Sequence, residues 1–185
     1  MREQTPEETL RTITVGEMPT YVPIVLVEYD PEWPALYERE ERRIRAILGD
    51  RVLRIDHFGS TSVPGLAAKP IIDISLAVPD SSDEPAYLPD LEAAGYVLRI
   101  REPDWHEHRL FKGPDTDINL HVFTIGSHEI QRQVGFRDWL REHPEDRDLY
   151  LHAKRDLAAR RWKYIQHYAD AKSQVIEEIL ARVGA

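Results

Sequence analysis

The sequence predicts an α+β protein in which a small mixed β-sheet has flanking helices and is followed by a C-terminal three-helix part. Up to about residue 126, short β-rich segments alternate with turn signals and helical segments. From residue 127 onward, apolar residues recur at helical spacing in three successive segments. We therefore expect one domain over residues 21–185, with a sheet part at 21–126 and a helical part at 127–185.

The composition is that of an ordinary globular protein, and it excludes several classes of function. Of the 185 residues, 42% are hydrophobic and 31% are charged. Because the chain has no cysteine, disulfides, thiolate metal sites and a cysteine nucleophile are excluded. The net charge of −9 argues against duplex nucleic acid as a partner. No apolar segment approaches the ~20 residues of a membrane span and no targeting signal is evident, so we expect a cytoplasmic protein that does not bind membranes.

The N-terminal third begins with an irregular segment and continues with a strand and a helix. Residues 1–20 are polar, contain two prolines and show no sustained period, so we expect a flexible N-terminal arm with one short helix at most. A β-rich run predicts a strand at Val22–Val27. Asp30 as N-cap and Pro31 at the first helical position then start an amphipathic helix that Gly49 ends.

The remaining elements follow from the same signals. β-rich runs bounded by turn residues predict strands at Val52–Phe58, Ile71–Val78, Tyr96–Arg101, His108–Lys112 and Ile118–Thr124. Helical spacing predicts one helix inside the sheet part and three after it, at Asp83–Ala94, Ser127–Glu142, Pro144–Arg161 and Tyr164–Val183.

Basic residues concentrate in the helical part. Residues 132–172 hold 10 basic and 7 acidic side chains, although the whole chain carries a net charge of −9. If this local excess of positive charge binds a ligand, a small anion fits it better than a polymer does. A solvated helix face explains the excess as well as a bound ligand does. A cleft between the sheet and the helices is the natural place for that ligand.

The turn-rich segment that follows the strand at 52–58 is the first candidate for ligand binding. Gly59 permits a sharp turn, and the hydroxyls of Ser60, Thr61 and Ser62, together with nearby backbone amides, are donors that suit phosphate oxygens. Two interpretations are open, because glycine, serine and proline also form ordinary turns. The segment is either a phosphate cradle or a plain loop.

Asp73 is the second candidate because it interrupts an apolar strand. Its neighbours in the chain are Ile72 and Ile74, and a carboxylate in such surroundings is expected to be paired, coordinated or directed into a cleft. A carboxylate after a Gly-Ser loop suggests metal-assisted phosphoryl chemistry, in which the acid holds Mg²⁺. The alternative is a structural aspartate bonded to neighbouring amides or to Lys69.

These motifs resemble the GrpB family (UPF0157), which belongs to the nucleotidyltransferase superfamily with a polymerase-β-like palm. The resemblance extends from about Val27 to Ile179. It is carried by Tyr29-Asp30-Pro31-Glu32-Trp33, by His57-Phe58-Gly59-Ser60-Thr61-Ser62-Val63-Pro64-Gly65-Leu66-Ala67-Ala68-Lys69-Pro70-Ile71-Ile72-Asp73-Ile74, by Leu120-His121-Val122, by Phe136 to Pro144, and by Tyr168 with Ala171-Lys172. It implies a sheet of nucleotidyltransferase type.

The resemblance also implies a metal-dependent site. The superfamily pattern is Gly-Ser, a spacer, and Asp-x-Asp or Asp-x-Glu, with a third acid on a nearby strand. The Gly-Ser turn and Asp73 match, whereas the second acid position falls on Ser75, which supplies no anionic ligand. Asp117, Asn119 and His121 share one face of their strand, so Asp117 is our candidate for a further Mg²⁺ ligand beside Asp73.

The histidine on the same strand is, together with Asp73, a candidate catalytic residue. His121 matches the family's Leu-His-Val, and it either positions a phosphate, donates a proton or packs as a core histidine. His106 and His108 lie two residues apart and offer a weaker alternative, a zinc or iron site near His121. The Gly-x-Ser-x-Gly turn of serine hydrolases is absent from the 59–65 segment.

The resemblance further assigns basic residues to phosphate binding. Lys69 follows the candidate cradle, while Arg109, Lys154 and Lys172 occupy positions that resemble family motifs. Lysine and arginine are the expected partners of a polyphosphate. Each of them taken singly also fits a solvated surface residue.

Two functions follow from these residues. The first is Mg²⁺-dependent nucleotidyl transfer from a nucleoside triphosphate to an acceptor that the sequence does not identify. The second is non-catalytic binding of a nucleotide or another phosphorylated small molecule by a protein that has lost the second metal-binding carboxylate. Ser75 favours the second function. The sequence does not specify the oligomeric state.

Overall fold

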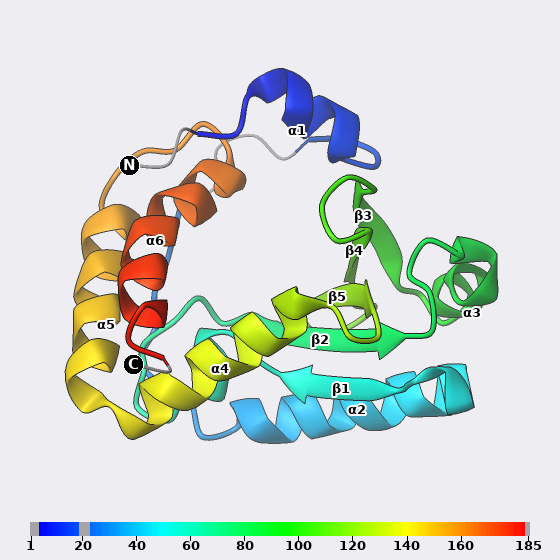
Figure 1. The fold of residues 1–185 in the computed structure, drawn as a ribbon, viewed down its shortest axis with the longest axis horizontal. Coiled ribbons are helices and arrows are strands. Elements are labelled where there is room, and N and C mark those ends of the chain that lie inside the picture. The colour runs from blue at the N-terminus through cyan, green and yellow to red at the C-terminus, as the bar shows by residue number, and fades with distance from the viewer. Residues whose placement is uncertain (1–3, 19–22, 184–185) are drawn as a thin grey trace.

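A computed structural model describes residues 4–18 and 23–183 and confirms the α+β fold (Figure 1). The mixed sheet has the strand order β1-β2-β5-β4-β3. Its strands are β1 (Arg54–His57), β2 (Ile72–Val78), β3 (Val97–Glu102), β4 (His108–Lys112) and β5 (Ile118–Thr124). The α-helices are α1 (Glu7–Ile13), α2 (Trp33–Leu48), α3 (Leu88–Ala93), α4 (His128–Glu142), α5 (Pro144–Ala158) and α6 (Ile165–Leu180).

The centre of the sheet brings the polar residues of two strands together. β2 runs parallel to β5, and their register pairs Asp73 with Asn119 and Ser75 with His121. Since side chains alternate along a strand, these four residues share one face of the sheet. The sequence prediction that Asn119 and His121 lie on the same face as Asp73 is therefore confirmed.

The opposite face of the sheet forms the main hydrophobic core. β2 contributes Ile72, Ile74, Leu76 and Val78, all of them buried as the alternation predicts. α2, α3 and the neighbouring strands complete this core with Trp33, Ile44, Leu48, Leu91, Phe111, Leu120 and Val122. This apolar layer holds β2 and β5 rigidly, so it also positions the polar side chains on their other face.

α4 covers only part of the polar face. Ala77 of β2 and Phe123 of β5 pack against Ile130 of α4 in a small separate cluster. Asp73 and Asn119 come earlier on the same strands, outside this cluster. The helix therefore leaves one end of the polar face free to line a cavity.

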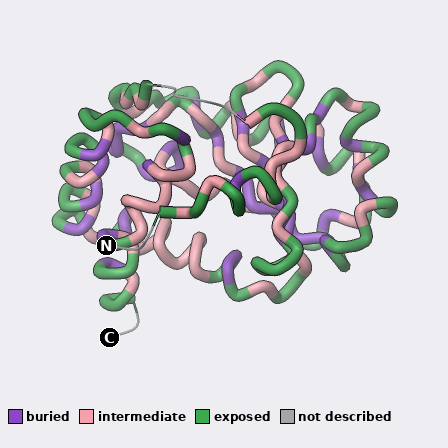
Figure 2. The backbone as a smooth tube through the Cα atoms, turned by 90° about the horizontal axis from the view of Figure 1, so that it is seen from above, coloured by how far each residue is buried: buried purple, intermediate pink, exposed green. Residues whose placement is uncertain are grey.

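The three C-terminal helices pack against the turn-rich loop after β1. Val63 and Leu66 of this loop are buried together with Leu140 of α4, Tyr150 of α5 and Ile179 of α6. Buried positions recur along these helices between exposed ones, as expected for amphipathic helices (Figure 2). The loop thus has a packing role in addition to any role in binding.

The N-terminal segment, expected to be a flexible arm, forms α1 over part of its length and contacts both parts of the molecule. Leu10 is buried, and Thr14 forms a β-bridge with Ile100 of β3. At the other end, the backbone N–H of Thr5 donates a 2.8 Å hydrogen bond to Asp170 of α6. α1 therefore lies between α6 and β3 (Figure 1). Residues 1–3 and 19–20 of this segment lie outside the described residues.

Two local predictions differ from the structure. The strand expected at Val22–Val27 is a single β-bridge from Val27 to Ala68, and Val22 lies outside the described residues. The helix expected at Asp83–Ala94 is a short 3₁₀ turn followed by α3, because prolines follow Glu84 and Leu88. Among helices of the described ranges, none has the length and apolar character to span a membrane.

Candidate functional site

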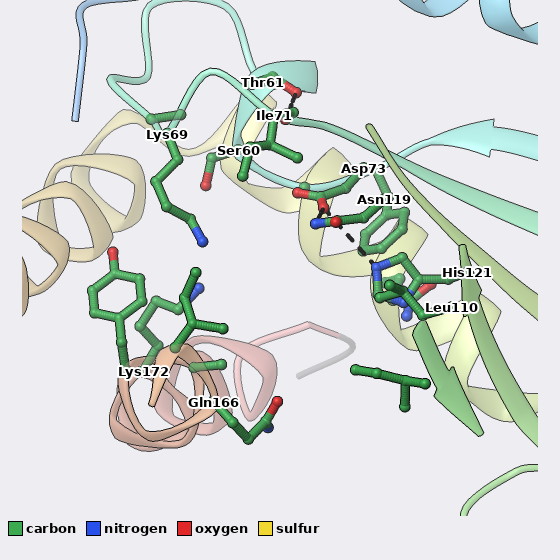
Figure 3. A pocket seen from close by; sticks show the side chains of 18 of the residues that line it. Ser60, Thr61, Lys69, Ile71, Asp73, Leu110, Asn119, His121, Gln166 and Lys172 are labelled. Carbon is green, nitrogen blue, oxygen red and sulfur yellow. Dashed lines mark hydrogen bonds and ion pairs between the residues drawn. The ribbon is translucent and has the colours of Figure 1, made fainter. Parts of the chain in front are cut away.

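A cavity of about 790 Å³ opens between the polar face of the sheet, the loop after β1, and helices α5 and α6. Figure 3 shows the side chains of some of the residues that line it. Those predicted from the sequence that line it are Gly59, Ser60, Thr61, Lys69, Asp73, His121, Lys154 and Lys172. The structure thus brings together residues that are up to 113 positions apart, from Gly59 to Lys172 (172 − 59).

Gly59 allows the loop to approach Asp73 closely. Its backbone has φ +65° and ψ 177°, a conformation that is essentially restricted to glycine. A Cβ at this position would lie 2.5 Å from Oδ2 and 2.8 Å from Cβ of Asp73. The glycine therefore has two functions at once, since it permits the turn and it leaves room for the carboxylate.

The carboxylate of Asp73 is held in place by its strand neighbour. Asn119 Nδ2 donates a 2.8 Å hydrogen bond to Asp73 Oδ1. Burial raises the pKa of Asp73 above its ordinary value, while the Asn119 hydrogen bond and the positive charges of Lys69 and Lys172 oppose that rise. Asn119, which sequence reasoning left without a role, thus orients the only carboxylate of the predicted site that reaches the cavity.

Three lysines reach the cavity from the side opposite Asp73. Lys69 follows the loop, Lys154 belongs to α5 and Lys172 to α6. Burial, with mutual repulsion, lowers the pKa of Lys69 to about 8 and that of Lys154 to about 7. Burial also lowers the pKa of Lys172. Lys154 Nζ donates a 2.6 Å hydrogen bond to the carbonyl of Ala67.

The lysine cluster has aromatic neighbours that were not predicted from the sequence. Tyr168 lies 5.5 Å from Lys69 Nζ and 4.8 Å from Lys172 Nζ, measured to the ring centroid. Tyr150 lies 5.0 Å from Lys154 Nζ in the same way. These contacts are within cation–π range and hold the ammonium groups at the cavity wall. The helical stripe that includes Tyr168 was a detectable signal, but its spacing indicates core packing equally well.

The hydroxyls of the candidate cradle divide between cavity and core. Ser60 lines the cavity. Burial raises the pKa of Tyr150 to about 12, and a hydrogen bond with Ser60 opposes this rise. Thr61 is buried, lies 2.9 Å from His57 Nε2, and donates to the carbonyl of Ile71 at 3.1 Å. Its hydroxyl therefore already has protein partners.

Ser62 lies away from the cavity. It is buried, and its hydroxyl donates a 2.6 Å hydrogen bond to the Gly59 carbonyl. Its own carbonyl accepts two hydrogen bonds from Arg141 of α4. The prediction that Ser62 binds phosphate therefore does not fit the structure, because local hydrogen bonding turns this residue back into the loop.

Arg109 and Asp117 are likewise not brought to the cavity. Arg109 is buried on the other face of β4, where Nε contacts Glu84 Oε1 at 2.6 Å. Strand alternation explains this, because Leu110 and Lys112 of β4 line the cavity and Arg109 therefore does not. Asp117 is mostly exposed and lies 3.0 Å from Lys112 Nζ. We therefore correct the assignments of Arg109 to phosphate and Asp117 to metal.

The residues around Asp73 do not fit a Mg²⁺ site. Mg²⁺ prefers an octahedral set rich in carboxylate and water oxygens. Within the described ranges, no group of three histidine, aspartate or glutamate side chains is arranged to hold a metal ion. Ser75, at the second acid position, is buried, and its hydroxyl has no hydrogen-bond partner among the described residues. The same finding removes the zinc or iron site considered for His106 and His108.

His121 lines the cavity beside Asp73, as predicted. Its Nε2 lies 4.0 Å from Asp73 Oδ1, and its Nδ1 lies 2.9 Å from Nε2 of His108. Burial and the neighbouring His108 lower the pKa of His121 well below its ordinary value. Both causes favour the neutral form of the imidazole.

Known proteins resemble this chain over most of its length, and one of them has a similar fold. The UPF0157 protein BH1888 of Halalkalibacterium halodurans is 60% identical over 97% of this chain and 92% of its own length. The UPF0157 protein SCO7215 of Streptomyces coelicolor is 45% identical over 94% of this chain and 91% of its own length. The crystal structure of the conserved protein GrpB from Enterococcus faecalis superposes with a TM-score of 0.72 at 31% identity, covering 85% of this chain and 98% of that one.

A more distant relative is a longer protein. A dephospho-CoA kinase of Mycolicibacterium paratuberculosis is 32% identical over 81% of this chain, which corresponds to 43% of the kinase. The five-stranded mixed sheet is consistent with the nucleotidyltransferase superfamily. The model of the family described as "GrpB protein" matches residues 23–182. This range includes all five strands of the sheet and the cavity lining except Leu10, Ile13, Thr14 and Met18. The chain therefore belongs to the GrpB family.

Proposed function

We propose that the protein binds a phosphorylated small molecule, such as a nucleotide, in the cavity between its sheet and its C-terminal helices. The lysine cluster of Lys69, Lys154 and Lys172 carries this proposal. Among the described residues, none of these three ammonium groups has an ion-pair partner within 4.0 Å. Burying a cation without a counter-ion is unfavourable in free energy. A polyphosphate offsets this by forming strong charge-assisted hydrogen bonds with the ammonium groups.

The rest of the cavity suits the remainder of such a ligand. Its volume of about 790 Å³ falls within the range of small-molecule sites. Aromatic side chains of Phe58, Phe136, Tyr164 and Tyr168 line it together with the polar groups. That relatives include dephospho-CoA kinases supports a nucleotide-like ligand, since the kinase acts on a nucleotide-containing molecule.

We expect affinity to depend on phosphate more than on base. Isothermal titration of adenosine, AMP, ADP and ATP should show affinity that rises with each phosphate, and inorganic tripolyphosphate should compete with ATP. Charge-assisted hydrogen bonds at about 1.5–3 kcal/mol each are the reason. A ligand at 100 times its Kd should also add ~2.7 kcal/mol to the free energy of unfolding, which a thermal shift detects. Equal affinity for adenosine and ATP would contradict the proposal.

Phosphate binding should weaken as the pH rises. Lys154 and Lys69 have pKa values of about 7 and about 8 in the free protein, so both lose their protons between pH 7 and 9. A bound phosphate stabilises the charged amines, which means that binding above pH 7 requires proton uptake. Calorimetric titrations in buffers of different ionisation enthalpy should show this proton uptake. The affinity for tripolyphosphate should fall by about tenfold or more from pH 7 to 9. An affinity that is independent of pH would contradict this assignment of the lysines.

The same lysines should make the free protein more stable as the pH rises. The folded-state pKa of Lys154 is depressed from 10.5 to about 7, so between these values the unfolded chain binds more protons. Stability therefore increases with pH across this window, and below pH 7 the full penalty of the buried charge is present. Unfolding in urea at several pH values should show this increase, with a smaller slope in Lys154→Met.

A second candidate function is the nucleotidyl transfer implied by the family resemblance. It is supported by the position of Asp73, which lies in the cavity next to the Gly59 turn. The second acid is missing because Ser75 occupies its place. We therefore expect Mg²⁺ to change the ATP affinity of the natural chain by less than about threefold, since one carboxylate facing three lysines is a poor cation site.

Replacing that serine tests the second candidate directly. Ser75→Asp should make nucleotide binding depend on Mg²⁺ and should lower stability, because it places a second carboxylate in a buried position near Asp73. Ser75→Asn, which has the same size and no charge, is the matched control. Strong Mg²⁺ binding, or metal-dependent nucleotidyl transfer by the natural chain, would show that our interpretation of Ser75 is wrong.

A further inference from the structure

A line of four ionisable side chains leads from the cavity to the outer end of the β3–β4 hairpin. Asp73 Oδ1 lies 4.0 Å from His121 Nε2, and His121 Nδ1 lies 2.9 Å from His108 Nε2. His108 Nδ1 in turn lies 2.6 Å from Glu102 Oε2. The two imidazole rings are stacked with centroids 5.1 Å apart, and His108 also stacks on Phe123. Both rings are therefore held in fixed orientations.

Glu102, the outermost member of this line, determines the direction of its hydrogen bonds. The carboxylate of Glu102 only accepts, so His108 carries a proton on Nδ1. In a neutral His108 the other nitrogen, Nε2, is then an acceptor, and His121 donates its Nδ1 proton to it. A neutral His121 consequently has no proton on Nε2. The nitrogen next to Asp73 presents a lone pair.

The distance to Asp73 supports this assignment. If His108 were doubly protonated, the pattern would reverse and His121 Nε2 would carry a proton beside a carboxylate. A charge-assisted hydrogen bond at about 2.7–2.9 Å would then be expected. The observed separation is 4.0 Å, and Asp73 Oδ1 accepts its hydrogen bond from Asn119 instead. Two acceptors thus lie side by side at the cavity wall.

We propose that Asp73 and His121 form an acceptor pair which binds a hydroxyl or amine group of the ligand. This inference rests on the proposed function, which places phosphate at the lysine cluster. Lys69 and Lys172 lie on the opposite side of the space from Asp73 and His121 (Figure 3). The cavity therefore selects a phosphate ester that also carries a hydrogen-bond donor at a distance from its phosphate, as ribose hydroxyls and amino groups of bases do.

Matched pairs of phosphate esters test this selection. Titration should compare ATP with 2′,3′-dideoxy-ATP, ATP with purine riboside 5′-triphosphate, which lacks the amino group, and glycerol 3-phosphate with n-propyl phosphate. In each pair the second compound lacks donor groups that the first one has. In at least one pair, the donor-bearing compound should bind the natural protein at least tenfold more tightly. Unpaired buried acceptors account for a loss of this size. His121→Phe should reduce the difference to less than threefold, whereas His152→Phe, on the exposed side of α5, should leave it unchanged.

The outcomes separate the two proposals. Equal binding within every pair overturns the acceptor pair and leaves the phosphate site intact. If no phosphate compound binds, the proposed function fails and this inference fails with it. Because His121→Phe also changes the ring packing against Phe58 and His108, a measurement that needs no ligand is added. Nitrogen NMR of the natural protein at pH 7.5 should show the His121 proton on Nδ1, and a proton on Nε2 would overturn the inference.

A substitution behind His121 completes the test. His108→Phe keeps an aromatic ring against Phe123 but removes the acceptor for His121 Nδ1. The NMR signature of a single tautomer should then be lost, and the preference for donor-bearing ligands should fall together with it. A retained tautomer and a retained preference would show that His108 does not position His121.

Discussion

Replacing Lys69 and Lys172 together by methionine should lower the affinity for ATP or tripolyphosphate by at least about a hundredfold. Each ammonium group is expected to contribute about 1.5–3 kcal/mol through charge-assisted hydrogen bonds to phosphate. Methionine matches the length of the lysine stem and removes only the charge. The substitutions are expected to keep or raise the thermal midpoint of the free protein, because both lysines are charges held partly out of water.

The combination of lost binding and preserved stability identifies a ligand site rather than a structural one. Lys163→Met is the matched control, since Lys163 is largely exposed and pairs with Glu7 at the surface. It should leave the affinity within about twofold, as expected for a surface ion pair. If the double variant binds tripolyphosphate as well as the natural chain does, the phosphate does not bind at the lysine cluster.

Gly59→Ala should lower the free energy of unfolding by at least about 3 kcal/mol. A backbone conformation restricted to glycine costs about 1–3 kcal/mol in another residue, and overpacking costs a similar amount. Both apply here, since φ is +65° and the added Cβ would lie 2.5 Å from Asp73 Oδ2. Asp73 would have to move away from Asn119, so ligand affinity should fall as well. Urea unfolding and titration with ATP measure the two effects.

A second glycine of the same loop separates the two contributions. Gly65 also has a positive φ, of +77°, but a Cβ there would meet nothing within 4 Å. Gly65→Ala should therefore cost only about 1–2 kcal/mol from backbone strain and leave ligand affinity unchanged. Equal losses of stability in the two variants would show that the contact between Gly59 and Asp73 has no energetic importance.

The order of elements, and the face of the sheet on which Asp73 lies, could be predicted from the sequence. The alternation around Asp73 correctly placed Ile72 and Ile74 in the core and the carboxylate on the other face, because strand periodicity is a local property of the chain. The turn at Gly59 and the boundaries of β4 and β5 were also predicted correctly, as turn chemistry and a short hairpin depend on neighbouring residues. The long resemblance then indicated the family, which the comparisons confirm.

Which polar residues face the cavity could not be predicted from the sequence and depends on the packing of the whole fold. Arg109 and Asp117 are close to Leu110 and Asn119 in the chain, yet neither lines the cavity, since one turns to Glu84 and the other to Lys112. The contacts of His121 with His108, and of the lysines with Tyr150 and Tyr168, join segments whose separation leaves no periodic signal. A sequence pattern reports which residues share one element. The face that an element turns to its neighbours is set by how all the apolar surfaces are buried together, and that is a property of the whole fold.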